Sequence, residues 1–237
     1  MKSLLPRLVL LTLILPFASG MAGSNRDIGS IPEEVLLTFL PIVAKPVPPV
    51  EPIETERGEY FGYPSSWWVY GYVNSLVPAP VYSVIVGINV TYYPYCDPDP
   101  CEPYQTTEPV YPAFPVTLPG QKNPFAWSLL LGKASASVGQ VNIVSWSLSG
   151  ESGISYYPLT VVDWHREGKA VLGRVRNDSV NDLVDGRVVV FSNECDWKEA
   201  SLTSTRLEPG QQTDFHLDYF YCEGDDLAVV GQGASVP

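Results

Sequence analysis

Strict alternation of apolar and polar residues marks the clearest predicted strand, from Ser83 to Tyr93. Its apolar positions are Val84, Val86, Ile88, Val90 and Tyr92, and the positions between them include Ser83, Gly87, Asn89 and Thr91. Successive side chains of a strand point to opposite faces. The pattern therefore predicts a half-buried strand with one wet face.

Similar short runs, separated by turn residues, recur along the rest of the chain. They are Phe125 to Leu131, Gln140 to Leu148, Leu159 to Trp164, Ala170 to Arg176, Gly186 to Ser192, Ser201 to Leu207, Phe215 to Tyr221 and Leu227 to Gly231. In the run from Phe215 to Tyr221, the expected apolar face is Phe215, Leu217, Tyr219 and Tyr221. Many short strands at regular spacing are typical of β-sandwiches.

One motif occurs twice and indicates a tandem repeat. The two copies are Pro119-Gly120-Gln121-x-x-x-Phe125 and Pro209-Gly210-Gln211-x-x-x-Phe215, preceded by Gly71 and Asn74 in the first and by Gly173 and Asn177 in the second. Pro-Gly presets a turn, and an asparagine amide caps one. A glycine within a strand indicates a bulge or a close backbone approach. The first copy is longer because of a Pro-rich insert at 94 to 115.

The order of these landmarks resembles FxLYD-type domains, which are small immunoglobulin-like sandwiches of bacterial secreted and surface proteins. The likeness covers most of residues 165 to 221 and, less closely, 68 to 131. Phe215-His216-Leu217-Asp218-Tyr219 is a partial echo of the naming motif. The resemblance implies an extracellular all-β fold of two tandem immunoglobulin-like β-sandwich domains.

Length and composition agree with that organisation. The chain has 237 residues, 23 Pro and 19 Gly, and only 17% of its residues are charged, which favours short strands and many turns. We expect a signal peptide at 1–22, a leader and Pro-rich linker at 23–56, a first domain at 57–150 and a second at 151–237. Ala44 to Pro52 is predicted to be a polyproline-type spacer.

The N-terminus is typical of an export signal. Lys2 and Arg7 precede an apolar core at Leu8 to Phe17, and Ala18-Ser19-Gly20 offers a cleavage site. The core is too short to span a bilayer, although an uncleaved anchor is the alternative. We expect a secreted or cell-surface protein without a transmembrane span. Its net charge of −12 disfavours nucleic acid as a partner.

The four cysteines form two local pairs in an exported chain, which favours disulfides. We expect Cys96 to pair with Cys101 and Cys195 with Cys222. Zinc is the competing interpretation for such spacing. Around the first pair, Asp97, Asp99 and Glu102 form a weak calcium candidate, and the alternative is a solvated acidic loop. We expect no cofactor.

Aromatic residues cluster in the first domain, and they are the candidate binding residues. We single out Trp67, Trp68, Tyr70, Tyr72, Tyr93 and Tyr95. Exposed aromatic residues stack on sugars or seat a partner protein, whereas in a small sandwich most belong to the core. Any contact with a protein or glycan is expected on the insert side of the first domain.

Catalytic motifs give little support to an enzyme. The two histidines, His165 and His216, fall in a predicted turn and on a predicted wet face, and Gly150-Glu151-Ser152-Gly153 falls short of a nucleophile elbow. We therefore assign no catalytic residue. The expected function is a non-enzymatic interaction or structural module, with a carbohydrate-binding protein and a weak extracellular hydrolase as alternatives.

Overall fold

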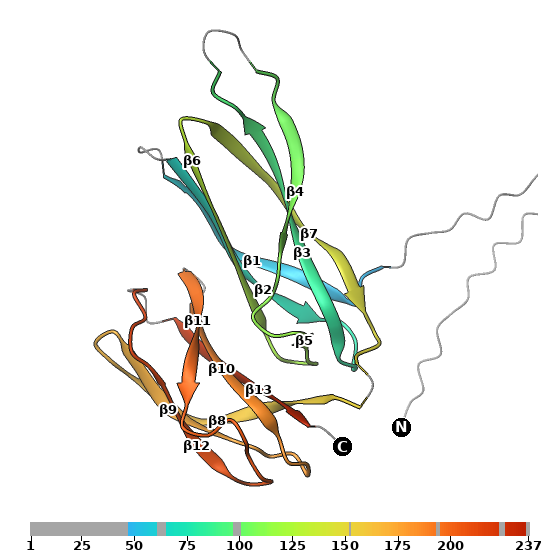
Figure 1. Ribbon diagram of the computed structural model, residues 1–237, viewed down its shortest axis with the longest axis vertical. Coiled ribbons are helices and arrows are strands. Elements are labelled where there is room, and N and C mark those ends of the chain that lie inside the picture. The colour runs from blue at the N-terminus through green and yellow to red at the C-terminus, as the bar shows by residue number, and fades with distance from the viewer. Residues whose placement is uncertain are drawn as a thin grey trace, which may run out of the picture. The chain divides into compact units, whose positions relative to one another are not determined.

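The computed structural model describes residues 47–60, 65–96, 101–151, 153–192, 195–222 and 226–235, and this part of the chain is all-β (Figure 1). Lys45–Pro237 is one compact unit. No helix long and apolar enough to cross a membrane occurs in the described part. The predicted signal peptide lies outside the described residues.

Among the described residues of the first half, 47–151, seven strands occur. They are β1 (Val50–Tyr60), β2 (Ser65–Ser75), β3 (Val81–Tyr93), β4 (Tyr104–Val110), β5 (Val116–Thr117), β6 (Asn123–Gly132) and β7 (Ser135–Ser147). One antiparallel sheet has the order β1-β2-β6. In the other, β3 pairs with β4, β5 and β7.

The core of the first half lies between these two sheets, as the alternation predicts. Val86, Ile88 and Val90 of β3 are buried and pack with Val69 and Phe125. The opposite positions Asn89 and Thr91 are only partly buried. The predicted wet face of β3 is confirmed only in part, because Gly87, which was also placed on it, is buried.

The second half, residues 153–235, has six strands in its described part. They are β8 (Ser155–Glu167), β9 (Ala170–Arg176), β10 (Val184–Ser192), β11 (Cys195–Leu202), β12 (Gln212–Leu217) and β13 (Leu227–Ser235). They close into a barrel with the order β10-β11-β12-β9-β8-β13 around Val171, Val175, Val188 and Phe215.

Closure of this barrel differs from the open sandwich predicted from the strand pattern. Ser155–Leu159 of β8 pairs with β13, whereas 160–167 pairs with β9. In the same way, β11 pairs with β10 up to Ala200 and with β12 at Ser201 and Leu202. Strands that switch sheets make the corners between two layers. The prediction missed this because it gave β8 a shorter segment and placed β11 too late in the chain.

The two motif copies fold alike at their turns. Gly120 and Gly210 have φ values of 72° and 77°, a left-handed conformation that favours glycine. The backbone N–H of Gln121 donates to Leu118 O at 3.1 Å, and the backbone N–H of Gln211 donates to Glu208 O at 3.0 Å. All ladders between the described strands join strands of the same half, and the predicted boundary at 150/151 falls between β7 and β8.

Both Pro-rich segments contain strand residues that the sequence analysis did not predict. Val50 to Pro52 of the predicted spacer begin β1 instead. Because β1 is an edge strand of its sheet, Pro52 can be accommodated despite its missing N–H. Within the insert, β4 pairs with β3 from Tyr92 to Val86. The insert therefore contributes a strand, β4, to the first half.

Two predicted segments of the second half are wrong in detail. The strand predicted at Ser201 to Leu207 overlaps only the end of β11, which begins at Cys195. The charged residues of β11 hide the apolar–polar alternation, so the prediction placed the strand too late. Leu207 forms only an isolated bridge with Leu183. β12 ends at Leu217, so the alternation stops there. Phe220 is then buried, and Tyr219 and Tyr221 of the predicted apolar face are exposed.

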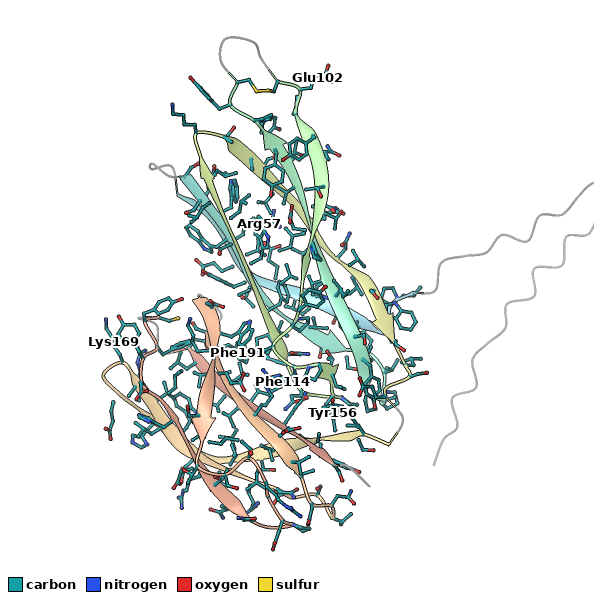
Figure 2. The ribbon with its side chains drawn as sticks, in the orientation of Figure 1. Arg57, Glu102, Phe114, Tyr156, Lys169 and Phe191 are labelled. Atoms are coloured by element: carbon teal, nitrogen blue, oxygen red, sulfur yellow. A yellow bond between two sulfur atoms is a disulfide. The ribbon has the colours of Figure 1, made fainter. Side chains whose placement is uncertain are left out.

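The two halves touch through a small third cluster and a glutamine pair. Ala113 and Phe114, the latter labelled in Figure 2, pack with Val189. Gln232 Nε2 donates to Val116 O at 2.8 Å and to Gln121 Oε1 at 2.6 Å. The motif glutamine of the first copy therefore serves the contact between halves, whereas Oε1 of Gln211 accepts the Glu208 amide.

Candidate functional site

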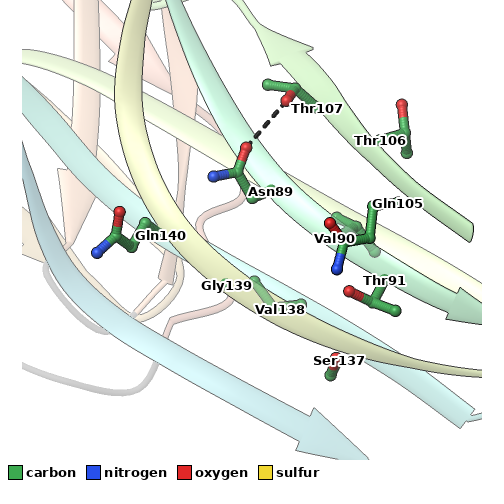
Figure 3. A pocket seen from close by; sticks show the side chains of 10 residues that line it. All are labelled: Asn89, Val90, Thr91, Gln105, Thr106, Thr107, Ser137, Val138, Gly139 and Gln140. Carbon is green, nitrogen blue, oxygen red and sulfur yellow. Dashed lines mark hydrogen bonds between the residues drawn. The ribbon is translucent and has the colours of Figure 1, made fainter.

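A polar groove runs over the outward face of β3, β4 and β7 in the first half (Figure 3). Its volume is about 460 Å³, within the usual range of ligand sites. Its lining consists of Asn89, Val90, Thr91, Gln105, Thr106, Thr107, Ser137, Val138, Gly139 and Gln140. None of these residues is charged, although the chain carries a net charge of −12.

Strand register brings the polar side chains of the groove together. Thr91 lies opposite Gln105 on β4 and Ser137 on β7, and Asn89 lies opposite Thr107. The Thr107 hydroxyl donates to Asn89 Oδ1 at 2.9 Å (Figure 3). This bond orients the amide, whose NH₂ group is a pair of donors. The groove therefore presents hydroxyl and amide groups that both donate and accept hydrogen bonds.

An irregularity in β7 contributes to the hollow. The register between β3 and β7 shifts between Ile88 and Val90, as expected for a bulge. Gly139 lies at this point, and a Cβ there would be 3.4 Å from the Cβ of Asn89. A glycine in a strand leaves the backbone accessible to a ligand. The floor of the groove is therefore partly main chain.

Tyrosines lie at the insert end of β3. Tyr93 pairs with Ser135 and follows the alternation of Asn89 and Thr91, so it faces outward, and 45% of its surface is exposed. Tyr95 is 59% exposed, with Lys133 Nζ 5.3 Å from its ring centre. These are two of the six predicted binding residues. Tyr93 therefore offers an exposed ring on the same face of β3 as the groove.

The remaining four predicted aromatic residues lie on β2, in the other sheet. Trp67 packs against the core, whereas Trp68, Tyr70 and Tyr72 alternate onto the outward face. Trp68 lies against Gly58 of β1, where a Cβ would clash with the indole, and Lys122 Nζ is 4.4 Å from the Tyr72 ring centre. The six residues therefore do not form one surface.

The disulfide turn closes the same end of the first half. Cys96 and Cys101 are bonded, with their Cα atoms 5.7 Å apart, which confirms the predicted pair. Asp97 and Asp99 of the calcium candidate lie outside the described residues, and Glu102 is exposed. Cys222 is buried and disulfide-bonded. The side chain of its predicted partner, Cys195, is not among those described.

A second cleft, which we call the aromatic cleft, lies between β6 and β11. Its volume is about 490 Å³, and its aromatic lining is Tyr70, Tyr111, Trp127, Trp197 and Tyr221. Asp196, Lys198 and Glu199 line it as well. Except for Tyr70, the sequence analysis missed these aromatic residues. They come from segments far apart in the chain, so no local pattern connects them.

The two histidines share a shallow pocket on the outward face of the barrel, and both are more than half exposed. His165 on β8 and His216 on β12 lie opposite Leu172 from its two sides. His165 Nε2 is 3.1 Å from Glu167 Oε1, and His216 Nε2 is 3.3 Å from Asp218 Oδ1.

The charges of this pocket are largely paired. The hydrogen bond from Arg174 lowers the pKa of Asp163 below its usual value. No set of three His, Cys, Asp or Glu residues placed to hold a metal ion occurs in the described ranges. The pocket therefore offers exposed histidines beside carboxylates.

No family model, curated protein or solved structure matches this chain.

Proposed function

We propose that the chain is an exported, non-enzymatic binding protein of two tandem immunoglobulin-like modules, and that the first module binds a neutral glycan in the polar groove. The tandem organisation is supported by the matching turns at Gly120 and Gly210 and by ladders that stay within each half. The predicted signal and the Cys96–Cys101 disulfide are compatible with export.

The observation that carries the ligand class is the uncharged lining of the groove in an acidic chain. A site for a neutral sugar needs many side chains that donate and accept hydrogen bonds. A net charge on such a site would not strengthen binding of the sugar. Asn89, Gln105 and Thr107 supply such groups from two strands. Tyr93 and Tyr95 add exposed rings on which a sugar face can stack.

The proposal also gives the insert a role, because the insert supplies one wall of the groove. β4 supplies Gln105 and Thr107, and only the first motif copy contains this insert. This supports the expectation that a ligand binds on the insert side. Because β4 pairs along β3, deletion of residues 96–109 would remove a strand together with the groove. Single substitutions are therefore the sharper test.

Binding to neutral and anionic polysaccharides in affinity gels would test the proposal. Gln105→Ala and Thr107→Ala should each lower affinity for the bound neutral glycan about two- to tenfold, the worth of a hydrogen bond. Gln212→Ala, at an exposed glutamine on β12, is the matched control and should bind as wild type does.

Two results would contradict the proposal. One is unchanged binding in a Gln105→Ala/Thr107→Ala double variant that unfolds as wild type does. The other is a preference for charged polymers. Hydrolysis of a bound glycan that is lost on His165→Ala or His216→Ala would instead support the hydrolase alternative.

A further inference from the structure

Next to Tyr70 of the aromatic cleft lies an unpaired carboxylate oxygen that the proposed glycan site does not explain. Glu56 lies opposite Tyr70 in the β1–β2 ladder. Its Oε2 atom is buried and has no hydrogen-bond partner among the described residues. A buried anionic oxygen without a partner costs free energy, so it indicates a missing cation or donor.

A second carboxylate, Asp196, lines the cleft from β11. Burial raises the pKa of Tyr70 to about 12, and the charge of Asp196, the Tyr221 hydroxyl and the charge of Glu56 add to this effect. The surroundings of the Tyr70 hydroxyl are thus negative. They resist further negative charge and favour a positive one.

The neighbouring basic groups offset only part of this negative charge. Arg187 is hydrogen-bonded to Glu199, at 3.0 and 2.7 Å, which lowers the pKa of that carboxyl group. Lys198 Nζ lies over the Tyr221 ring, 5.5 Å from its centre. The Lys198 contact also shows that a cation can approach this ring face.

We infer that the aromatic cleft binds an organic cation, an alkylammonium or guanidinium group, between its aromatic rings and the carboxylates of Glu56 and Asp196. Aromatic walls attract cations through their ring faces, and recognition of quaternary ammonium groups is a common use of such cages. A calcium ion would need six to eight oxygen ligands, and two carboxylates offer fewer.

Titration with choline, followed by tryptophan fluorescence and calorimetry, tests the site in the full chain. The matched probe is 3,3-dimethylbutan-1-ol, which has the same shape without the charge. Choline should bind about tenfold more tightly than the alcohol, as expected for a partly desolvated cation–π contact. Equal affinities, or no binding of choline, would overturn the inference.

Variants locate the site. Glu56→Gln and Asp196→Asn keep the shape of each side chain and should weaken choline binding about tenfold, whereas Thr107→Ala in the polar groove should leave it unchanged. Lys198→Met removes the competing cation and should strengthen choline binding, a gain that misfolding cannot produce. Unchanged choline affinity in all three cleft variants would show that the cation binds elsewhere.

Discussion

The ring of Phe215 lies against Gly173 on the neighbouring strand, and a Cβ on that glycine would be 2.6 Å from the Phe215 ring and 2.4 Å from Asp163 O. Phe125 and Gly71 repeat this arrangement in the first half, at 2.7 Å from the ring. The motif phenylalanine therefore covers a strand glycine in both copies. This contact explains why the two landmarks occur together.

Gly173→Ala should consequently destabilise the protein by about 1–3 kcal/mol, because the added methyl group overpacks a filled site. Urea unfolding followed by tryptophan fluorescence measures this change. Gly139→Ala is the control, since a Cβ there meets its neighbours at 3.4 Å and should change stability by less than about 0.5 kcal/mol. Equal stabilities of the two variants would contradict the packing argument.

Asn177→Ala should cost about 2 kcal/mol or more, because buried main-chain groups lose their partners. The Asn177 amide donates to Asn181 O at 2.8 Å and Leu207 O at 2.9 Å, and it accepts from the Ser179 amide at 2.9 Å.

Asn74, its counterpart in the first copy, is only half-buried and donates to Glu51 at 3.3 Å. Asn74→Ala should therefore cost much less than Asn177→Ala. Denaturant midpoints decide between them, and a larger loss at Asn74 would be inconsistent with these contacts.

Alkaline pH should destabilise the wild-type protein partly through Tyr92. Burial, followed by the charge and hydrogen bond of Glu108, raises its pKa from 10.0 to about 12. A raised folded-state pKa contributes stability that is fully present below pH 10.0 and is lost as the pH rises towards about 12.

Tyr92→Phe should therefore lose less stability over this pH range than wild type, as thermal midpoints at stepped pH would show. Glu108→Gln, which removes the charge but keeps the side-chain shape, should give a partial effect. Parallel curves for Tyr92→Phe and wild type would contradict the assignment.

Peptide mapping without reduction should find Cys195 linked to Cys222, because Cys222 is bonded and Cys96–Cys101 form the other pair. Loss of the longer loop in a Cys195→Ser/Cys222→Ser variant should cost about 3–4 kcal/mol. The control variant Cys96→Ser/Cys101→Ser removes a disulfide that closes a much shorter loop, so its loss of stability should be only about 2 kcal/mol. A peptide that links the two halves would refute the pairing.

Sequence periodicity predicted the parts of the fold that depend on local order. The alternation of Ser83 to Tyr93 identified β3 and its buried face, and the paired glycines and turns identified equivalent positions in both halves. Closure of the barrel was not predicted, because it depends on where β8 and β11 change partners. Such a change leaves no local signal.

The candidate sites were predicted less well than the fold for the same reason. Aromatic composition pointed to the first half, but it could not separate Trp67, which packs in the core, from Tyr93, which is exposed. The groove joins hydroxyl and amide groups of three strands. None of these groups is unusual in sequence, and only the register between β3, β4 and β7 brings them together.

The closed barrel also gives the two ends of the molecule unequal capacities for assembly. Each described strand of the barrel has a partner on both sides, whereas β4 in the first half pairs with β3 alone. Unpaired edge strands are templates for strands of other molecules, and the Pro109 of β4 blunts this edge only in part. Any assembly by strand addition would therefore have to use edge strands of the first half, and the described strands of the barrel would take no part in it.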